Sequence, residues 1–502
     1  MATYYFKGSF FAGGSYPYAS WADARNWFTA TNGGGSSLYA LNGNSQNPGI
    51  QSTDNVIFDQ NSLSSTQFVQ LAGANRACAN IDMTGFNGTI YSGNYDIQVY
   101  GTSIILPAIG TSGVFDPNVY PGLDIKSGTT TTITTNGQTV GTITISNGST
   151  LVLQDDLTSF NNVILTIDNG TFNANDKNVT LGGITDTSST SNKTITMGSG
   201  RWILGGEGPA NNAFTIWNIQ GPSYFTLNKD TSKIRIVGYS GVSSLYYNLA
   251  SSEDSGSIIK IVGALTQATV NAAAQYVNWP SSGIVLIDDE YITYTGLTTV
   301  QRNEVNLTIG SRGYYNTSKV THNAKTAVLL IYPQVVNLVS TITSSSTTSI
   351  GVSDVTAFGG GSPLVGHMLI DDEVIYYRNV DSVNKLLGTT AIERGTIYGG
   401  QASKHNAGAK VMTVQSRIFN DGGKSYPPIE VWSTGSYFIT DFTGNGTSSG
   451  GGFSNITLNF LGPQQIQFGT YMSPTETYYV YKPQSSASTG DFFETFWYRD
   501  HA

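Results

Sequence analysis

The chain has 502 residues and a net charge of −9, and only 11% of its residues are charged, against about 25% in an average soluble domain. Its 58 glycines show no three-residue period and no heptads appear, which excludes collagen and coiled coil. Val, Ile, Leu, Phe, Tyr and Trp recur throughout and argue against wholesale disorder. The composition predicts a folded, all-β protein with several cores.

The charge and the rare residue types exclude several classes of function. Basic residues are few and scattered, so no nucleic-acid surface is expected. No apolar run reaches the 18 or so residues of a membrane span. Cys78 is the only cysteine, which excludes an intrachain disulfide and a cysteine zinc cage. We expect no metal and no cofactor, because the only histidines are His322, His367, His405 and His501.

Residues 1–79 form an aromatic, glycine-rich β segment. Trp21 and Trp27 flank a short polar stretch, Pro48 follows a glycine-rich loop, and residues 54–59 alternate as a short strand does. This spread of Asn-Trp, glycine loop, proline and Asp-x-Val-x-Phe resembles the opening of bacterial and phage β-helix modules.

Residues 80–250 read as short strands separated by tight turns. Apolar residues alternate in 143–145 and 151–153 around Asn147-Gly148, and the same pattern surrounds Asn169-Gly170. Asn and Gly supply the positive φ of such corners. Gly148 and Gly170 lie 22 residues apart, close to one coil of a β-helix. A right-handed parallel β-helix is the first prediction for this region, and a β-sandwich is the alternative.

A duplication follows a polar break at residues 251–256. Its two copies, 257–333 and 334–415, are predicted to be small β modules, and their landmarks recur 82 or 83 residues apart. Alternation stops at the acidic pair and resumes after the glutamate, which predicts the tip of a β-hairpin. The landmarks are Asp288, Asp289, Glu290, Arg312, Gly313 and His322 in the first copy, and Asp371, Asp372, Glu373, Arg394, Gly395 and His405 in the second.

Residues 416–502 are predicted to form a β-rich C-terminal domain. A glycine-rich loop at 444–452 interrupts it, and five aromatic residues fall within 492–498. Aromatic residues gathered at a chain end are expected to be buried against the preceding domain or another subunit.

The duplicated unit resembles a small β module of tailed-phage tail, baseplate and fibre proteins. The shared pattern is Gly-x-Ile-x-Ile-Asp-x-Glu-x-Ile-x-Tyr, then Arg-Gly, then His-x-x-Gly-Ala-x-Val. The second copy fits it with Gly408, whereas the first has Lys325 where the pattern has glycine. The resemblance implies a virion structural or host-adhesion protein and implies no chemistry.

The acidic clusters and their basic partners admit two interpretations. Carboxylates of this density could hold calcium or form an acid/base pair for glycan cleavage. We prefer a structural interpretation, in which the acids form a hairpin tip and the arginine and histidine tie the following loop to it.

A polysaccharide depolymerase is the main alternative function, and it requires two carboxylates about 5 to 9 Å apart. Asp155, Asp156 and Glu207 are the nearest candidates. Neighbouring residues of a strand point to opposite faces, so the first two do not form a pair by themselves. No catalytic residue is assigned, and we expect no enzymatic activity.

The sequence therefore predicts a bacteriophage virion structural protein of the tail, baseplate or fibre, made in the host cytoplasm and released by lysis. Its expected partners are other virion proteins, sister chains in a homotrimer, and a host cell-surface glycan. A capsid decoration protein, a head fibre and a bacterial surface adhesin remain as further alternatives.

Overall fold

The protein, described by a computed structural model, divides into two compact units: Met1–Ile203 with Gln220–Lys233 and Gly241–Leu330, and Leu204–Ile219 with Ile234–Ser240 and Ile331–Ala502. Glu207, Asp372, His501 and most of segments 444–452 and 492–498, all singled out above, lie outside the described residues. The structure describes all residues except 9–17, 43–48, 64–66, 72, 92–94, 110–113, 116–121, 160–162, 206–213, 239–240, 247, 250–257, 263–278, 302–303, 315–316, 332–334, 347, 356–357, 359–364, 372, 396–400, 421–423, 433–436, 444–451, 454–455, 460–463, 469–479, 482–496 and 499–502.

The all-β class predicted from the sequence is confirmed. Helices within the described segments are single short turns, and none of them has the length and apolar character that crossing a bilayer requires. They are η1 (Ala24–Asn26), η2 (Thr31–Gly33), α1 (Leu38–Asn42) and η4 (Pro222–Tyr224).

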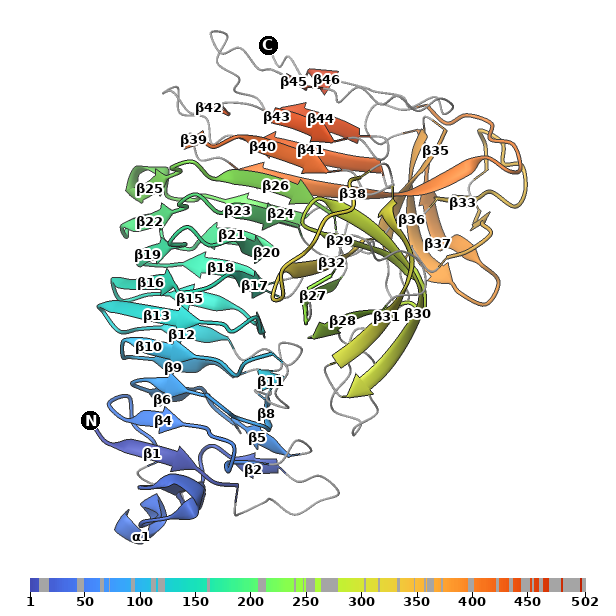
Figure 1. The fold of residues 1–502 in the computed structure, drawn as a ribbon. Coiled ribbons are helices and arrows are strands. Elements are labelled where there is room, and N and C mark those ends of the chain that lie inside the picture. The colour runs from blue at the N-terminus through green and yellow to red at the C-terminus, as the bar shows by residue number, and fades with distance from the viewer. Residues whose placement is uncertain are drawn as a thin grey trace. The chain divides into compact units, whose positions relative to one another are not determined.

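Parallel ladders make up most of the first unit (Figure 1). Within each parallel ladder a strand pairs with the third strand after it in the chain, which is the pairing that stacked coils of three strands produce. The first ladder is β1 (Thr3–Phe6), β4 (Asn55–Ile57), β7 (Ile81–Asp82), β10 (Ser103–Ile105), β13 (Thr130–Thr134), β16 (Ser149–Leu153), β19 (Gly170–Asn173), β22 (Lys193–Thr196) and β25 (Phe225–Asn228), with β3 (Trp27–Phe28) antiparallel to β1. The second is β6 (Arg76–Cys78), β9 (Ile97–Val99), β12 (Leu123–Ile125), β15 (Ile143–Ile145), β18 (Ile164–Ile167) and β21 (Gly183–Asp186). Shorter ladders are β2 (Tyr18–Ser20), β5 (Phe68–Gln70), β8 (Thr89–Tyr91) and β11 (Val114–Phe115), and β14 (Thr139–Val140), β17 (Leu157–Ser159), β20 (Val179–Leu181) and β23 (Arg201–Leu204).

The coils stack because the same side-chain position is apolar in each of them. Leu123, Ile143, Leu165 and Ile184 are successive partners in the second ladder, and all four are buried. Since side chains alternate across a strand, the residues between them face away from this column. The period-2 pattern in the sequence therefore becomes one continuous core.

Asparagines at the corners link one coil to the previous one. Asn136 has a φ of 53° and Asn175 a φ of 50°, a left-handed conformation that Asn tolerates better than most residues. Their side-chain amides donate to the backbone oxygens of Leu106 and Leu153, each at 2.8 Å. The asparagine-rich turns thus supply both the corner geometry and a hydrogen bond between coils.

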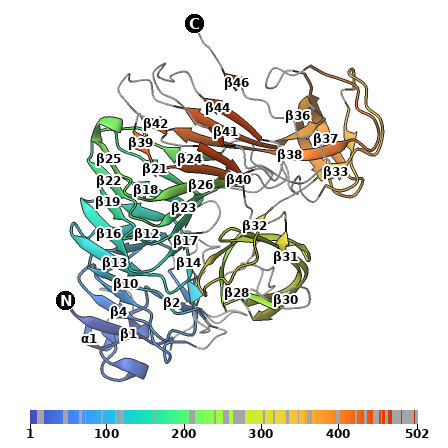
Figure 2. The same ribbon diagram turned by 45° about the horizontal axis from the view of Figure 1, so that its top comes forward.

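The first copy of the duplicated module is a closed antiparallel barrel (Figure 2). It begins at Gly241, ahead of residue 257, where the sequence places the start of the copy. Alternate residues of β28 and β31, such as Ile259 and Leu307, point into its apolar core. The barrel order is β27 (Gly241–Leu245), β28 (Ile258–Val262), β31 (Glu304–Tyr314), β30 (Glu290–Gln301), β29 (Gly283–Ile287) and β32 (Ala327–Ile331).

The second copy, in the second unit, repeats this strand order. Its sheet runs β34 (Ile350–Gly351), β37 (Leu386–Glu393), β36 (Glu373–Asp381), β35 (Val365–Ile370) and β38 (Lys410–Asn420), with β33 (Val335–Asn337) paired to β38. The long strand β38 continues into a parallel ladder with β24 (Phe214–Asn218), β41 (Tyr437–Thr443), β44 (Gln464–Phe468) and β46 (Trp497–Tyr498). The other strands of this unit are β26 (Lys233–Val237), β40 (Ile429–Trp432), β43 (Ile456–Asn459) and β45 (Val480–Tyr481), and the pair β39 (Ser425–Tyr426) and β42 (Gly452–Phe453).

Candidate functional site

The acidic clusters lie at the tips of two equivalent hairpins. Glu290 pairs with Ile287 across a two-residue turn, and Asp288 in that turn has a φ of 51°. In the second copy Glu373 pairs with Ile370, and Asp371 has a φ of 52°. Each aspartate therefore occupies the left-handed position of the turn, and each glutamate is the first residue of the returning strand.

Glu290 is held by the arginine of the same module. Arg312 donates from Nε to Glu290 Oε1 at 3.0 Å and from Nη2 to Oε2 at 2.5 Å. The backbone amides of Gly313 and Val320 donate to the same carboxylate at 2.8 and 3.1 Å. Arg312 also donates to the carbonyl oxygen of Val320. The two parallel hydrogen bonds from Arg312 to Glu290 are the strong form of an arginine–carboxylate contact.

His322 joins Glu290 to the hairpin tip. Its Nδ1 lies 2.7 Å from Asp288 Oδ2, and its Nε2 lies 3.0 Å from Glu290 Oε2. Carboxylate oxygens only accept hydrogen bonds when ionised, so this geometry requires a proton on each ring nitrogen. The backbone of His322 also exchanges hydrogen bonds with Leu249. The histidine thus fixes the tip, the strand and the loop to one another.

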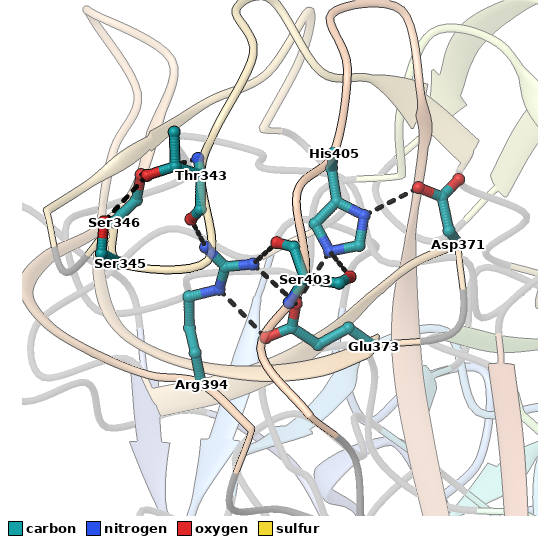
Figure 3. A network of polar contacts seen from close by, with 8 residues as sticks. All are labelled: Thr343, Ser345, Ser346, Asp371, Glu373, Arg394, Ser403 and His405. Carbon is teal, nitrogen blue, oxygen red and sulfur yellow. Dashed lines mark hydrogen bonds and ion pairs between the residues drawn. The ribbon is translucent and has the colours of Figure 1, made fainter.

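The second copy repeats the network (Figure 3). Arg394 donates from Nε and Nη2 to the two oxygens of Glu373 at 3.0 and 2.6 Å. His405 contacts Asp371 Oδ2 through Nδ1 at 2.7 Å and Glu373 Oε2 through Nε2 at 2.8 Å. The amide of Ser403 donates to Glu373 at 3.1 Å. Arg394 additionally donates to the carbonyl oxygen of Thr343, so its guanidinium also binds the loop that contains Thr343.

The first network is balanced in charge, and it is buried except for Asp288, whose side chain is 42% exposed. The side chains of Glu290, Arg312 and His322 are fully buried, and two cations face two anions. Burial by itself raises the pKa of Glu290, but hydrogen bonds from His322, Arg312 and two backbone amides outweigh it and lower the pKa to about 2. Burial lowers the pKa of His322, and its contacts with Asp288 and Glu290 reverse this, so the pKa is raised overall.

Glu373 is likewise held in its ionised form. Burial opposes its charged form, yet the hydrogen bonds from Arg394, His405 and Ser403 lower its pKa below the usual value. Both glutamates are therefore ionised acceptors at neutral pH. Neither has the raised pKa that a general acid for glycan cleavage requires.

The calcium interpretation also finds little support in these contacts. Asp288 is bound to His322, and Asp289 forms an ion pair with Arg201 at 2.9 Å. Among the described residues, no group of three or more His, Cys, Asp or Glu side chains is placed to hold a metal ion. The network therefore has the geometry of a structural clasp.

The carboxylates of Asp155 and Asp156, the candidates for a depolymerase, accept hydrogen bonds from neighbouring coils. Asp155 accepts from the amides of Thr135 and Asn136, both at 2.7 Å. Asp156 accepts from the backbone and side-chain amides of Asn178 at 2.9 and 3.0 Å. Each aspartate thus stabilises a neighbouring coil. Asp156 also lines a small pocket of about 40 Å³ together with Arg201 and Asp288.

Sequence reasoning missed the residues that complete each network through their backbone. Val320 and Ser403 donate to the two glutamates and accept from the two arginines. They lie 83 residues apart, at the offset of the duplication, but they share no side-chain type. Only the offset could have identified them. No family model, curated protein or solved structure matches the chain.

Proposed function

We propose that this protein is a structural component of a tailed-phage virion, located in the tail, baseplate or fibre, which acts by surface contact in assembly or host adhesion. The observation that carries the proposal is the repeated clasp. Its glutamates are buried and ionised, and the arginine, histidine and backbone amides that bind each glutamate belong to the same module. Such a site stabilises a shape and offers no reactive group to a substrate.

Two further features support a role as a stiff, inert element. Parallel ladders with a continuous apolar column resist bending because each coil packs on its neighbours. The duplicated motif resembles modules of phage tail and fibre proteins, and the low charge fits a surface that works by contact. The phage assignment depends on that resemblance, and the structural role depends on the clasp.

Imaging of particles tests the location. An antibody against the purified chain, applied to phage particles from the source lysate, is expected to label tails in electron micrographs, and the chain is expected in the mass spectrum of those particles. Particles purified to homogeneity that lack the chain would refute the virion assignment. Labelling of capsids alone would show that the protein is located in the head and would contradict the tail assignment.

We also propose that the chain assembles as a homotrimer in the particle, as long β fibres commonly do. The mass in solution, measured by light scattering after gel filtration, is expected to be three times that of one chain. A monomer across the accessible concentration range would contradict the trimer and leave the structural role intact.

Incubation with host capsular polysaccharide tests the depolymerase alternative. We expect the viscosity of the polysaccharide to stay unchanged, and a fall in viscosity would establish the depolymerase instead.

A further inference from the structure

A lysine, an asparagine and a glutamate meet on the outer face of the first barrel. Lys260 on β28 is the register partner of Asn306 on β31, and the Nζ of Lys260 is in contact with Glu304, two residues before Asn306. These three residues take the strand positions that alternate with the core residues Ile259, Ile261, Val305 and Leu307. They therefore share one face of the sheet.

The positions of these groups bring an amine close to an amide. Directly opposed residues of antiparallel strands have Cβ atoms about 4.5–5.5 Å apart, and diagonal neighbours lie within reach of long side chains. Lys260 is seen to reach the diagonal neighbour Glu304. Because Asn306 is directly opposite Lys260 and on the same face as Glu304, we infer that Nζ can also reach the carboxamide of Asn306. The ring of Tyr246 closes the other side, with its centroid 4.4 Å from Nζ.

This part of the barrel surface is shielded from water. The side chain of Glu304 is 3% exposed and that of Lys260 is 20% exposed, and Ser244 and Val262 beside them are buried. The Oδ1 of Asn306 is buried and has no hydrogen-bond partner among the residues that the structure describes. Buried carbonyl oxygens are nearly always paired, so an unpaired one requires an explanation.

We propose that Lys260 and Asn306 form an intramolecular isopeptide bond, with Glu304 as the catalytic proton carrier. The ion pair is the starting state: the ammonium of Lys260 transfers a proton to the carboxylate of Glu304, and the free amine attacks Cγ of Asn306. The protonated Glu304 polarises the unpaired Oδ1. Holding the reactants on adjacent strands supplies the high effective concentration that amide exchange requires.

The reaction balances without any co-reactant. The new bond joins Lys260 Nζ to Asn306 Cγ, and the bond between Cγ and Nδ2 breaks. Glu304 returns its proton to the leaving nitrogen, and the second proton lost by Nζ goes the same way. One ammonium ion leaves, Glu304 is regenerated as a carboxylate, and no oxidant or reductant takes part.

The second copy supplies an internal comparison. When Arg312 is aligned with Arg394, the positions of Glu304 and Asn306 correspond to Leu386 and Gly388 on β37. Neither residue can take part in this chemistry. The cross-link is therefore a property of the first barrel, independent of the clasp that both copies share, and it does not depend on the proposed virion role.

Intact-mass spectrometry of the denatured full-length chain tests the proposal. The wild-type chain is expected to be lighter than its sequence by one ammonia. Because Asn-Gly pairs such as Asn147-Gly148 also lose ammonia when they form succinimides, a tryptic map must locate the loss. Cleavage after Lys260 is expected to fail, and the peptide of residues 303–312 is expected to be joined to the peptide that contains Lys260.

Variants separate the roles of the three residues. Lys260→Arg, Asn306→Ala and Glu304→Gln are each expected to have the full mass and a free 303–312 peptide, with circular dichroism verifying that they fold. Asn306→Asp is expected to form the same bond with loss of water in place of ammonia. Lys193→Arg, in the parallel ladder, is the control and is expected to retain the link.

Two results would overturn the proposal. A folded wild-type chain of full mass that trypsin cleaves after Lys260 would show that no bond forms. A Glu304→Gln chain that still carries the Lys260–Asn306 link would remove Glu304 from the chemistry.

Discussion

Arg312 and Glu290 form a two-point ion pair in which neither side chain is exposed to solvent. Their counterparts Arg394 and Glu373 do the same with 5% and 1% of their side chains exposed. A buried pair of this kind adds little net stability compared with apolar residues, but the loss of one partner leaves an uncompensated charge in the core. The clasp is therefore a feature whose removal is costly.

Glu290→Gln is expected to lower the free energy of unfolding of the first module by about 3–5 kcal/mol, because Arg312 and His322 then remain buried without their anion. Urea unfolding followed by circular dichroism measures the effect. The matched control is Asp289→Asn, at the other position of the same hairpin turn, where the ion pair with Arg201 lies at the surface, with side chains 55% and 31% exposed. Its loss is expected to cost at most about 1 kcal/mol, and equal effects of the two variants would contradict the clasp.

The hairpin tips could be predicted from the sequence, whereas some buried ion pairs could not. Alternation around residues 288 and 371, together with the offset of the duplication, predicts which acids, arginines and histidines belong to one module. Arg235 and Glu430 form an equally specific pair at 2.9 Å, with the guanidinium 3.7 Å above the ring of Trp432. These residues are 195 positions apart, and only the pairing of β26 with β40 brings them together.

The start of the first barrel could not be predicted from the sequence either, because it also depends on contacts between distant segments. The polar segment 251–256 has the composition of a linker, which predicts a boundary there. The barrel nevertheless takes β27 (Gly241–Leu245) from the chain before that segment, since β27 pairs with both β28 and β32 and closes the sheet. The composition of a segment depends on that segment alone, whereas the closure of a barrel depends on strands far apart in the sequence. Composition therefore cannot predict which strand closes the barrel.

The stability of the first module is expected to depend on pH through Glu290 and His322. The pKa of Glu290 is lowered from 4.5 to about 2, so its contribution is present above pH 4.5 and is lost as the pH falls toward 2. The pKa of His322 is raised above 6.5, so its contribution is complete below pH 6.5 and is lost as the pH rises through the folded value. Both contributions are present between about pH 4.5 and 6.5.

The measurement is the free energy of unfolding against pH for the wild type and for His322→Gln. The difference between the two curves is expected to be largest in that window and to shrink at higher pH. His367→Gln serves as a control of opposite sign. Burial lowers the pKa of His367, so its contribution is present above pH 6.5 and is lost as the pH falls. Parallel curves for wild type and His322→Gln would show that His322 is not charged in the folded state.

Gly170 is expected to be intolerant of any side chain. It has a φ of +140°, and a Cβ there would lie 2.2 Å from the carbonyl oxygen of Ser149 and 2.9 Å from Cγ2 of Ile145. Gly148 on the adjacent coil has a φ of +72° and open space around it. Gly148→Ala is expected to cost about 1–2 kcal/mol from backbone strain alone, and Gly170→Ala is expected to cost more. Urea midpoints compare the two, and a smaller effect at Gly170 would show that the backbone there can relax.

The aromatic residues of the N-terminal segment form one cluster around Phe58. Its ring centroid lies 5.1–5.4 Å from those of Phe6, Trp21, Trp27 and Phe86, and the side chain is fully buried. These contacts join β1, the turn at residues 21–22 and two later coils, so the cluster closes the first coils of the ladder.

Phe58→Ala is therefore expected to cost about 3–5 kcal/mol, from lost transfer free energy and the cavity that remains. Tryptophan fluorescence follows the loss directly, because Trp21 and Trp27 pack against Phe58. Tyr39→Ala, at a side chain 41% exposed, is expected to change stability by no more than about 0.5 kcal/mol. Hydrogen exchange resolves where the loss occurs: amides of β1 and β4 are expected to exchange faster in Phe58→Ala, while those of the barrel strands keep their protection. Uniform acceleration across the first unit would mean instead that the ladder and the barrel unfold as one cooperative body.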